Sequence, residues 1–141
     1  MHPENFPRLS EDNFRITSPA KWEYNCLAWT LNDTMTWWST APGYYWPPRV
    51  PRPMTNLVNV IQLYEREGFT RCDSAAFEAG FERIVLYSAD GHFVHAARQL
   101  ENGRWTSKLG PHEDIEHDTP EALLGGEFEL VACILRRSRS V

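Results

Sequence analysis

The chain has 141 residues, a length typical of one domain, and its 42% hydrophobic and 23% charged residues are close to the averages for soluble globular proteins. A net charge of −5 argues against a protein that binds duplex nucleic acid through a basic face. No apolar run approaches the roughly 20 residues of a membrane-spanning helix, and the first residues lack the pattern of a secretory signal. We therefore expect a cytoplasmic protein that binds neither nucleic acid nor a membrane.

Three cysteines stand far apart in the chain, at positions 26, 72 and 133. This spacing gives neither a disulfide framework nor the close cysteine pair of a zinc site, so we expect free thiols. Cys72 and Cys133 lie in apolar strand-like segments and are interpreted as core residues.

The first half of the chain predicts two helices joined by a long loop. Residues 1–17 contain two prolines and no period, and are expected to form an irregular arm. A helix is predicted over residues 21–31, where four apolar residues recur at helical spacing; the alternative is a later start capped by Asn25. A second helix is predicted from Thr55 to Glu67, closed by Gly68.

The loop between these helices, residues 35–53, contains five prolines and cannot form regular structure. It also carries a group of aromatic residues. We expect these rings either to line a substrate cleft or to cover a small core, and the sequence leaves both interpretations open. The rings are those of Trp37, Trp38, Tyr44, Tyr45 and Trp46.

The second half predicts strands. Asp90-Gly91 and Asn102-Gly103 are typical two-residue hairpin turns, so residues 82–109 should form a three-stranded antiparallel meander. A last strand is predicted over residues 128–135. The expected fold class is therefore α+β, with helices on one face of an antiparallel sheet. Residues 18–136 would form this single domain, and residues 137–141 a frayed basic tail.

Cys26 is the candidate nucleophile. It lies about 150° away from the apolar stripe of the predicted helix, whereas a cysteine that only fills the core would lie within it. If the helix begins near Asn25, the sulfur lies in its first turn, where free N–H groups favour a thiolate. The alternative is a small buried residue covered by Trp22 and Trp29.

His95 is the candidate base. Strand alternation places it on one face with Phe93 and Ala97, and the predicted hairpin places it opposite Leu86. The alternative is a hydrogen-bonded core histidine.

A polar residue after the next strand would hold the ring of His95. Asp114 is the best placed by sequence, and Ser107 and His117 are the alternatives. A metal site at His112 and His117 is the weaker interpretation of this stretch, because the spacing is one residue longer than in the zinc helix motif. We expect a solvated acidic loop there, with no metal and no cofactor.

The order of a cysteine, a histidine and a polar residue is that of a cysteine hydrolase. Residues 24–29 resemble the cysteine-bearing helix of papain-like folds, including the NlpC/P60 branch, and residues 84–96 are similar to their strand–turn–strand ending in a histidine. The resemblance implies a papain-like fold with Cys26 as nucleophile and His95 as base. Segments 24–29, 95–100, 105–110 and 114–117 also resemble a group of small bacterial proteins of unassigned function.

The sequence therefore predicts a cysteine-dependent hydrolase or acyl-transfer enzyme that acts on an amide bond. The substrate would be a peptide, a peptidoglycan stem or a side-chain amide of a protein. The backbone N–H of Cys26 would stabilise the oxyanion, with Asn25 as a possible second donor. The alternative is a non-catalytic module that binds a protein partner through the aromatic loop and the acidic residues 113–129.

Overall fold

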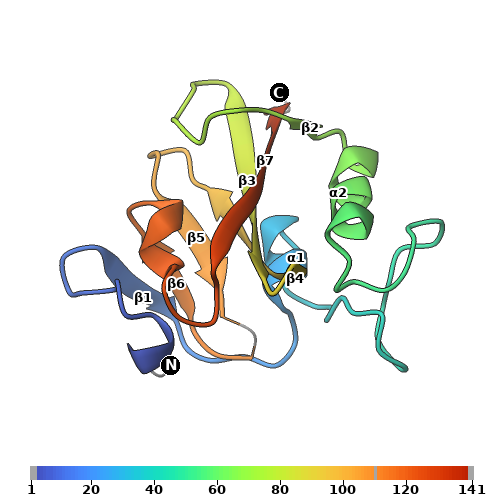
Figure 1. Ribbon diagram of the computed structural model, residues 1–141, viewed down its shortest axis with the longest axis horizontal. Coiled ribbons are helices and arrows are strands. Elements are labelled where there is room, and N and C mark those ends of the chain that lie inside the picture. Colours follow the sequence, from blue (N-terminus) through green and yellow to red (C-terminus); the bar gives the residue numbers. More distant parts are fainter. Residues whose placement is uncertain (1–2, 110, 140–141) are drawn as a thin grey trace.

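A computed structural model describes residues 3–109 and 111–139, and within them the chain forms one antiparallel sheet of seven strands (Figure 1). The strands lie in the order β1-β6-β5-β4-β3-β7-β2. Their bounds are β1 Phe14–Ser18, β2 Thr70–Arg71, β3 Phe81–Ala89, β4 His92–Gln99, β5 Trp105–Lys108, β6 Asp114–His117 and β7 Leu130–Ser138. The helices are α1 Cys26–Thr30 and α2 Leu57–Arg66, with 3-10 turns η1 Pro3–Asn5 and η2 Pro120–Leu123. In this part of the chain no helix is long and apolar enough to span a membrane.

The expected papain-like α+β fold, with N-terminal helices on one face of a sheet, is wrong. The protein is mostly antiparallel sheet with two small helices. Asn25 starts α1 later than the helical period suggests, because its side chain accepts a hydrogen bond from the backbone N–H of Ala28. Strand β1 lies at the end of the segment expected to be irregular, and β7 continues to Ser138.

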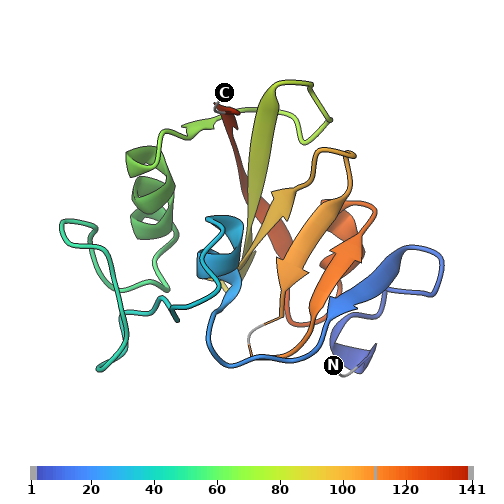
Figure 2. The same ribbon diagram turned by 180° about the vertical axis from the view of Figure 1, so that it is seen from behind.

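Apolar side chains cover both faces of the sheet. In β3 the residues alternate, so Ile84 and Leu86 contact the core beneath α1 and α2, while Val85 and Tyr87 contact a second core on the other face. Figure 2 shows α1 in front of the first face, and Figure 1 shows the segment around η2 in front of the opposite face. Burial on both faces explains why the middle of β3, from Ile84 to Tyr87, is apolar without alternation.

A β-bulge in β4 decides which face His95 occupies. The Asp90-Gly91 turn is confirmed, with Ala89 paired to His92. The register then shifts, because Val94 is an extra residue, and His95 pairs with Tyr87 instead of Leu86. The prediction that His95 shares a face with Phe93 is therefore wrong: Phe93 contacts the α1 side, whereas the ring of His95 stacks on Phe128 of the other core.

The first half of β4 lies at a split in the sheet. Its pairing with β5 is confined to Arg98 with Thr106 and Gln99 with Trp105, so residues 92–97 have no strand partner on that side. Helix α1 lies against this stretch and contacts both strands, as Figure 2 shows. Cys26, the first residue of α1, is therefore brought to the edge of β4 beside Ala96.

Helix α2 covers the same face as α1. It is capped by Asn56 rather than by Thr55, and it buries Val60, Ile61, Leu63 and Tyr64. Gly68 follows the helix with a φ of 94°, a conformation that only glycine adopts without strain. The helix therefore ends where the sequence predicts it to end.

We expect Gly126→Ala to loosen the N-terminal segment. A Cβ at Gly126 would lie 2.1 Å from the backbone oxygen of Asn5, and that segment carries the buried Phe6. Overpacking of this kind costs about 1–3 kcal/mol. Tryptic cleavage after Arg8 should become faster in this variant. In the control Gly43→Ala, where the added Cβ meets no atom within 4 Å, cleavage should keep its rate; equal rates in the wild type and Gly126→Ala would contradict the prediction.

Candidate active site

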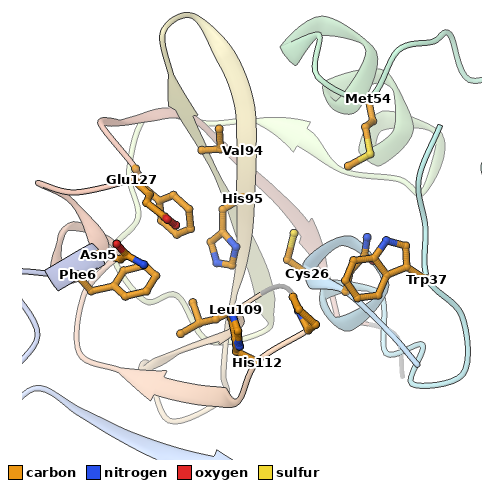
Figure 3. Close-up of a pocket in the computed structure, with 13 residues that line it drawn as sticks. Asn5, Phe6, Cys26, Trp37, Met54, Val94, His95, Leu109, His112 and Glu127 are labelled. Atoms are coloured by element: carbon orange, nitrogen blue, oxygen red, sulfur yellow. The ribbon is translucent and has the colours of Figure 1, made fainter. Parts of the chain in front are cut away.

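A pocket of about 360 Å³ opens at the split between β4 and β5, and both Cys26 and His95 line it. Figure 3 shows the sulfur and the ring facing the same space, with Trp37 and Met54 on the side of Cys26 and Phe6 on the side of His95. Most of the lining side chains are apolar. The structure thus brings together the two residues whose order in the sequence suggested a reaction.

The sulfur of Cys26 lies among backbone donors. The N–H groups of Cys26, Leu27 and Ala96 all interact with it, and each lowers the pKa of the thiol. Burial has the larger and opposite effect and raises the pKa of Cys26 to about 11, because only 8% of the residue is exposed. The group is therefore a protonated thiol at neutral pH.

The ring of His95 lies deeper, with 2% of the residue exposed. It stacks on Phe128 at 4.7 Å between centroids and contacts Tyr87 at 5.4 Å. Burial, and to a smaller extent the nearby His117, lower the pKa of His95 to about 3, so the ring is neutral at neutral pH. Its Nε2 is buried without a hydrogen-bond partner among the described residues.

Asp114 does not lie beside His95. Its Oδ2 accepts hydrogen bonds from Ser18 Oγ at 2.5 Å and Tyr24 Oη at 2.6 Å. Its neighbour Ile115 packs in the same core as Tyr87, so strand alternation directs Asp114 to the opposite face of the sheet. The carboxylate therefore anchors the segment that precedes α1.

Ser107 and His117, the other two candidates, form a buried pair on the face of His95. Ser107 Oγ lies 2.8 Å from His117 Nε2, and His117 Nδ1 lies 2.8 Å from the carbonyl oxygen of Thr119. A carbonyl only accepts, so Nδ1 donates to it and Nε2 accepts from the hydroxyl of Ser107. Burial lowers the pKa of His117 to about 4. Neither residue lines the pocket.

Asn25 lines the pocket, but its side chain already has partners. Its Nδ2 donates to the carbonyl of Trp38 at 2.6 Å, and its Oδ1 accepts from the backbone N–H groups of Ala28 and Trp38. The amide therefore caps α1 and holds the aromatic loop against it. The Nδ2 group of Asn25 therefore points to the carbonyl of Trp38 rather than into the pocket.

The rings of the aromatic loop divide between the border of the pocket and the core. Trp37 borders the pocket, and the half-exposed Tyr44 lies against it at 6.3 Å between centroids. Trp46 is buried in the core and donates through Nε1 to the carbonyl of Val50. Trp38 and Tyr45 pack edge to face outside the pocket lining.

The stretch around His112 and His117 is not arranged as a metal site. His112 borders the pocket, whereas His117 is held by Ser107 in the core. Across residues 3–109 and 111–139, no group of three or more His, Cys, Asp or Glu is placed to hold a metal ion. Two of the acidic residues, Glu116 and Asp118, are paired with Arg104.

Sequence reasoning missed one charged residue near the site, Lys108. It is the last residue of β5 and is fully buried, with its Nζ donating to the backbone carbonyls of Lys21 and His112. A lysine inside a strand ordinarily reaches solvent, so nothing in the local pattern distinguishes it.

The chain belongs to the family described as a domain of unknown function (DUF7689), whose model matches residues 15–136. No curated protein and no solved structure matches the chain.

Proposed function

We propose that this protein is a cysteine-dependent hydrolase or acyl-transfer enzyme that acts on an amide bond, with Cys26 as nucleophile and His95 as base. The observation that carries the proposal is that the sulfur and the imidazole line one pocket, with three backbone N–H groups at the sulfur. A thiol, a base and preorganised donors are the groups that acyl transfer through a thioester requires.

The reaction begins from two neutral groups. Because the thiol and the imidazole are both uncharged at neutral pH, His95 takes the proton of Cys26 while the sulfur attacks the carbonyl carbon. The amine then leaves with that proton, and a thioester remains on Cys26. Water, or another acceptor, attacks the thioester with His95 again as base, and the acid and the free thiol are released.

In this proposal the ring of His95 is oriented by packing rather than by Asp114. Phe128 stacks on it with planes 11° apart, and Tyr87 lies on the paired strand. The apolar walls and the pocket volume of about 360 Å³ suit a short apolar acyl group. A peptide, a peptidoglycan stem or a protein side-chain amide each supplies such a group.

A non-catalytic protein-binding module is the second candidate. It is favoured by large apolar side chains at the surface, since Trp22 is 76% and Met35 83% exposed. The second part of the surface expected for this module, the acidic residues 113–129, is partly neutralised. Arg15 and Arg104 both pair with Glu116.

The test is acetylation of Cys26 by p-nitrophenyl acetate, a small ester that transfers an acyl group in the same first step. The experiment uses a variant with Cys72→Ser and Cys133→Ser, in which Cys26 is the only cysteine left. We expect a burst of p-nitrophenolate equal to the amount of protein, and a mass increase of one acetyl group on the peptide that contains Cys26. His95→Gln should slow the burst by about 100-fold, the usual contribution of a general base.

His92→Gln is the matched control, because His92 is an exposed histidine at the start of the same strand, beside the hairpin turn. This variant should acetylate at the rate of the parent protein. Acetylation of Cys26 that is no slower in His95→Gln than in His92→Gln would overturn the proposed catalysis.

A further inference from the structure

The pocket has a polar end, formed by Asn5 and Glu127, which both line it. Figure 3 shows these two side chains on the side of His95 that faces away from the sulfur of Cys26. Phe128, which follows Glu127 in the chain, stacks on the ring of His95 at 4.7 Å between centroids. The backbone N–H of Glu127 donates to the carbonyl of Asn5 at 3.4 Å. The polar end is therefore built directly onto the candidate base.

The polar side chains at this end lack partners. Within residues 3–109 and 111–139, Glu127 forms no ion pair and no side-chain hydrogen bond, and the side-chain amide of Asn5 forms none either. Arg8 lies against Gly125 without pairing to Glu127. The Nε2 atom of His95, in a residue that is 2% exposed, is unpaired in the same part of the chain. Buried polar atoms are rarely left unpaired, and a ligand site is one physical reason for such atoms.

The polar end carries a negative charge. Glu127 supplies a carboxylate, and the described residues that line the pocket include no lysine or arginine. The apolar walls strengthen the attraction between a carboxylate and a positive charge that enters the pocket. The amide oxygen of Asn5 is a further acceptor for the N–H groups of such a cation. An ammonium or a guanidinium group is therefore the chemistry that this end favours.

The proposed reaction determines which part of an amide substrate reaches the polar end. The carbonyl carbon lies at the sulfur of Cys26, and the leaving nitrogen lies at His95, because the ring gives its proton to that nitrogen. The acyl group then extends toward Trp37 and Met54, which Figure 3 shows on the side of Cys26. The rest of the leaving amine extends past His95 to the polar end.

We infer that Glu127 binds a positive charge at the polar end, and so selects amide substrates whose leaving amine carries one. A peptide with a basic residue directly after the scissile bond is such a substrate. The selection among substrates rests on the proposed catalysis by Cys26 and His95. Glu127 is a specificity residue, which does not touch the reacting atoms. Its side chain is exposed, so it should favour a charged substrate by about 5-fold, the effect of one solvated ion pair.

The test is a competition between argininamide and citrullinamide, which have nearly the same shape but differ in the charge of the side chain. Equal amounts are added, at about pH 8 where much of each α-amine is neutral, to the acetylated variant in which Cys26 is the only cysteine. The α-amine attacks the thioester, so that a C–N bond forms while the C–S bond breaks, and the proton of the amine passes through His95 to the sulfur. An acceptor amine occupies the place of a leaving amine, so argininamide should take the acetyl group about 5-fold faster. Mass spectrometry of the two Nα-acetyl products gives the ratio.

Glu127→Gln should transfer the acetyl group to both amides at equal rates. Glu129→Gln is the matched control, because it removes the same charge at a residue outside the pocket lining and keeps an oxygen for the backbone N–H of Asp90. This control should keep the preference for argininamide. Equal rates in the parent protein, or an unchanged preference in Glu127→Gln, would overturn the inference, while acetylation of Cys26 would still support the enzyme.

A binding measurement separates the inference from the proposed enzyme. Both amides are titrated into the ¹⁵N-labelled protein without acetylation, and the backbone amide signals of Glu127 and Phe128 are followed by NMR. We expect argininamide to bind about 5-fold more tightly than citrullinamide, and this difference to disappear in Glu127→Gln. Such a preference without any acetylation of Cys26 would keep the cation site at Glu127 and refute the proposed enzyme. If Cys26 is not acetylated, equal binding of the two amides would overturn the inference.

Discussion

Asp114→Ala is expected to destabilise the protein by about 3–5 kcal/mol, because it removes two buried hydrogen bonds to a charged acceptor, each worth about 1.5–3 kcal/mol. The carboxylate is 2% exposed and accepts hydrogen bonds from Ser18 and Tyr24. Without it, the buried Lys108 also loses the favourable electrostatic interaction with this carboxylate. Urea unfolding at neutral pH, followed by tryptophan fluorescence, measures the change.

Asp118→Ala is the matched control for this change. Asp118 lies in the same acidic stretch and is paired with Arg104, but its side chain is 42% exposed. Exposed ion pairs contribute about 0–1 kcal/mol, so this variant should unfold close to the wild type. Equal losses in the two variants would contradict the structural role given to Asp114. A loss of acetylation without a loss of stability in Asp114→Ala would return Asp114 to the catalytic site.

Mild acid is expected to destabilise the protein through two buried histidines. The pKa of His95 is about 3 and that of His117 about 4 in the folded protein, whereas an unfolded histidine has a pKa near 6.5. Between these values the unfolded chain binds more protons than the folded one, so the free energy of unfolding falls as the pH falls. From about pH 6.5 to about pH 4.5 we expect a loss of about 2 kcal/mol for each histidine.

Urea unfolding at both pH values, on the wild type and on three variants, checks this expectation. His95→Gln and His117→Gln should each remove about 2 kcal/mol of the pH-dependent loss. His92→Gln should leave the loss intact, because this exposed ring is hydrated in both states. The same dependence on pH in all four proteins would show that neither buried ring is the cause.

The pH dependence bears on the proposed reaction as well. A neutral His95 accepts a proton, whereas a charged one does not, and the lowered pKa of His95 keeps the ring neutral well below neutral pH. The pH dependence of the acetylation rate above about pH 5 should then follow the ionisation of the thiol rather than that of the imidazole.

Several local features were predicted from the sequence because short-range interactions determine them. The Asp90-Gly91 turn forms since both residues adopt a positive φ, which suits the twist of a hairpin. The start of α1 at Cys26 follows from the hydrogen bond that the side chain of Asn25 accepts, and this was one of the two starts left open. Helix α2 lies within the predicted range because its amphipathic period and Gly68 are local signals.

Other features depended on contacts between distant segments. The bulge at Val94 is set by how β4 packs against β3 and the cores on both faces, and one extra residue moved His95 to the other face. The split between β4 and β5, which opens the pocket, has no signal in either strand alone. The papain-like fold was expected from motifs in short segments, and such motifs do not specify how seven strands pair.

The sequence by itself determined the Asp90-Gly91 turn, the end of α2 before Gly68 and the residue types that make Cys26 and His95 candidates. The tertiary structure alone decided that these two line one pocket, that Asp114 holds the segment before α1, and that Lys108 is buried beside the site. The physical reason is the range of the interactions. Caps and turns are settled within about four residues, whereas burial, electrostatic coupling and strand register arise between residues that are far apart in the chain.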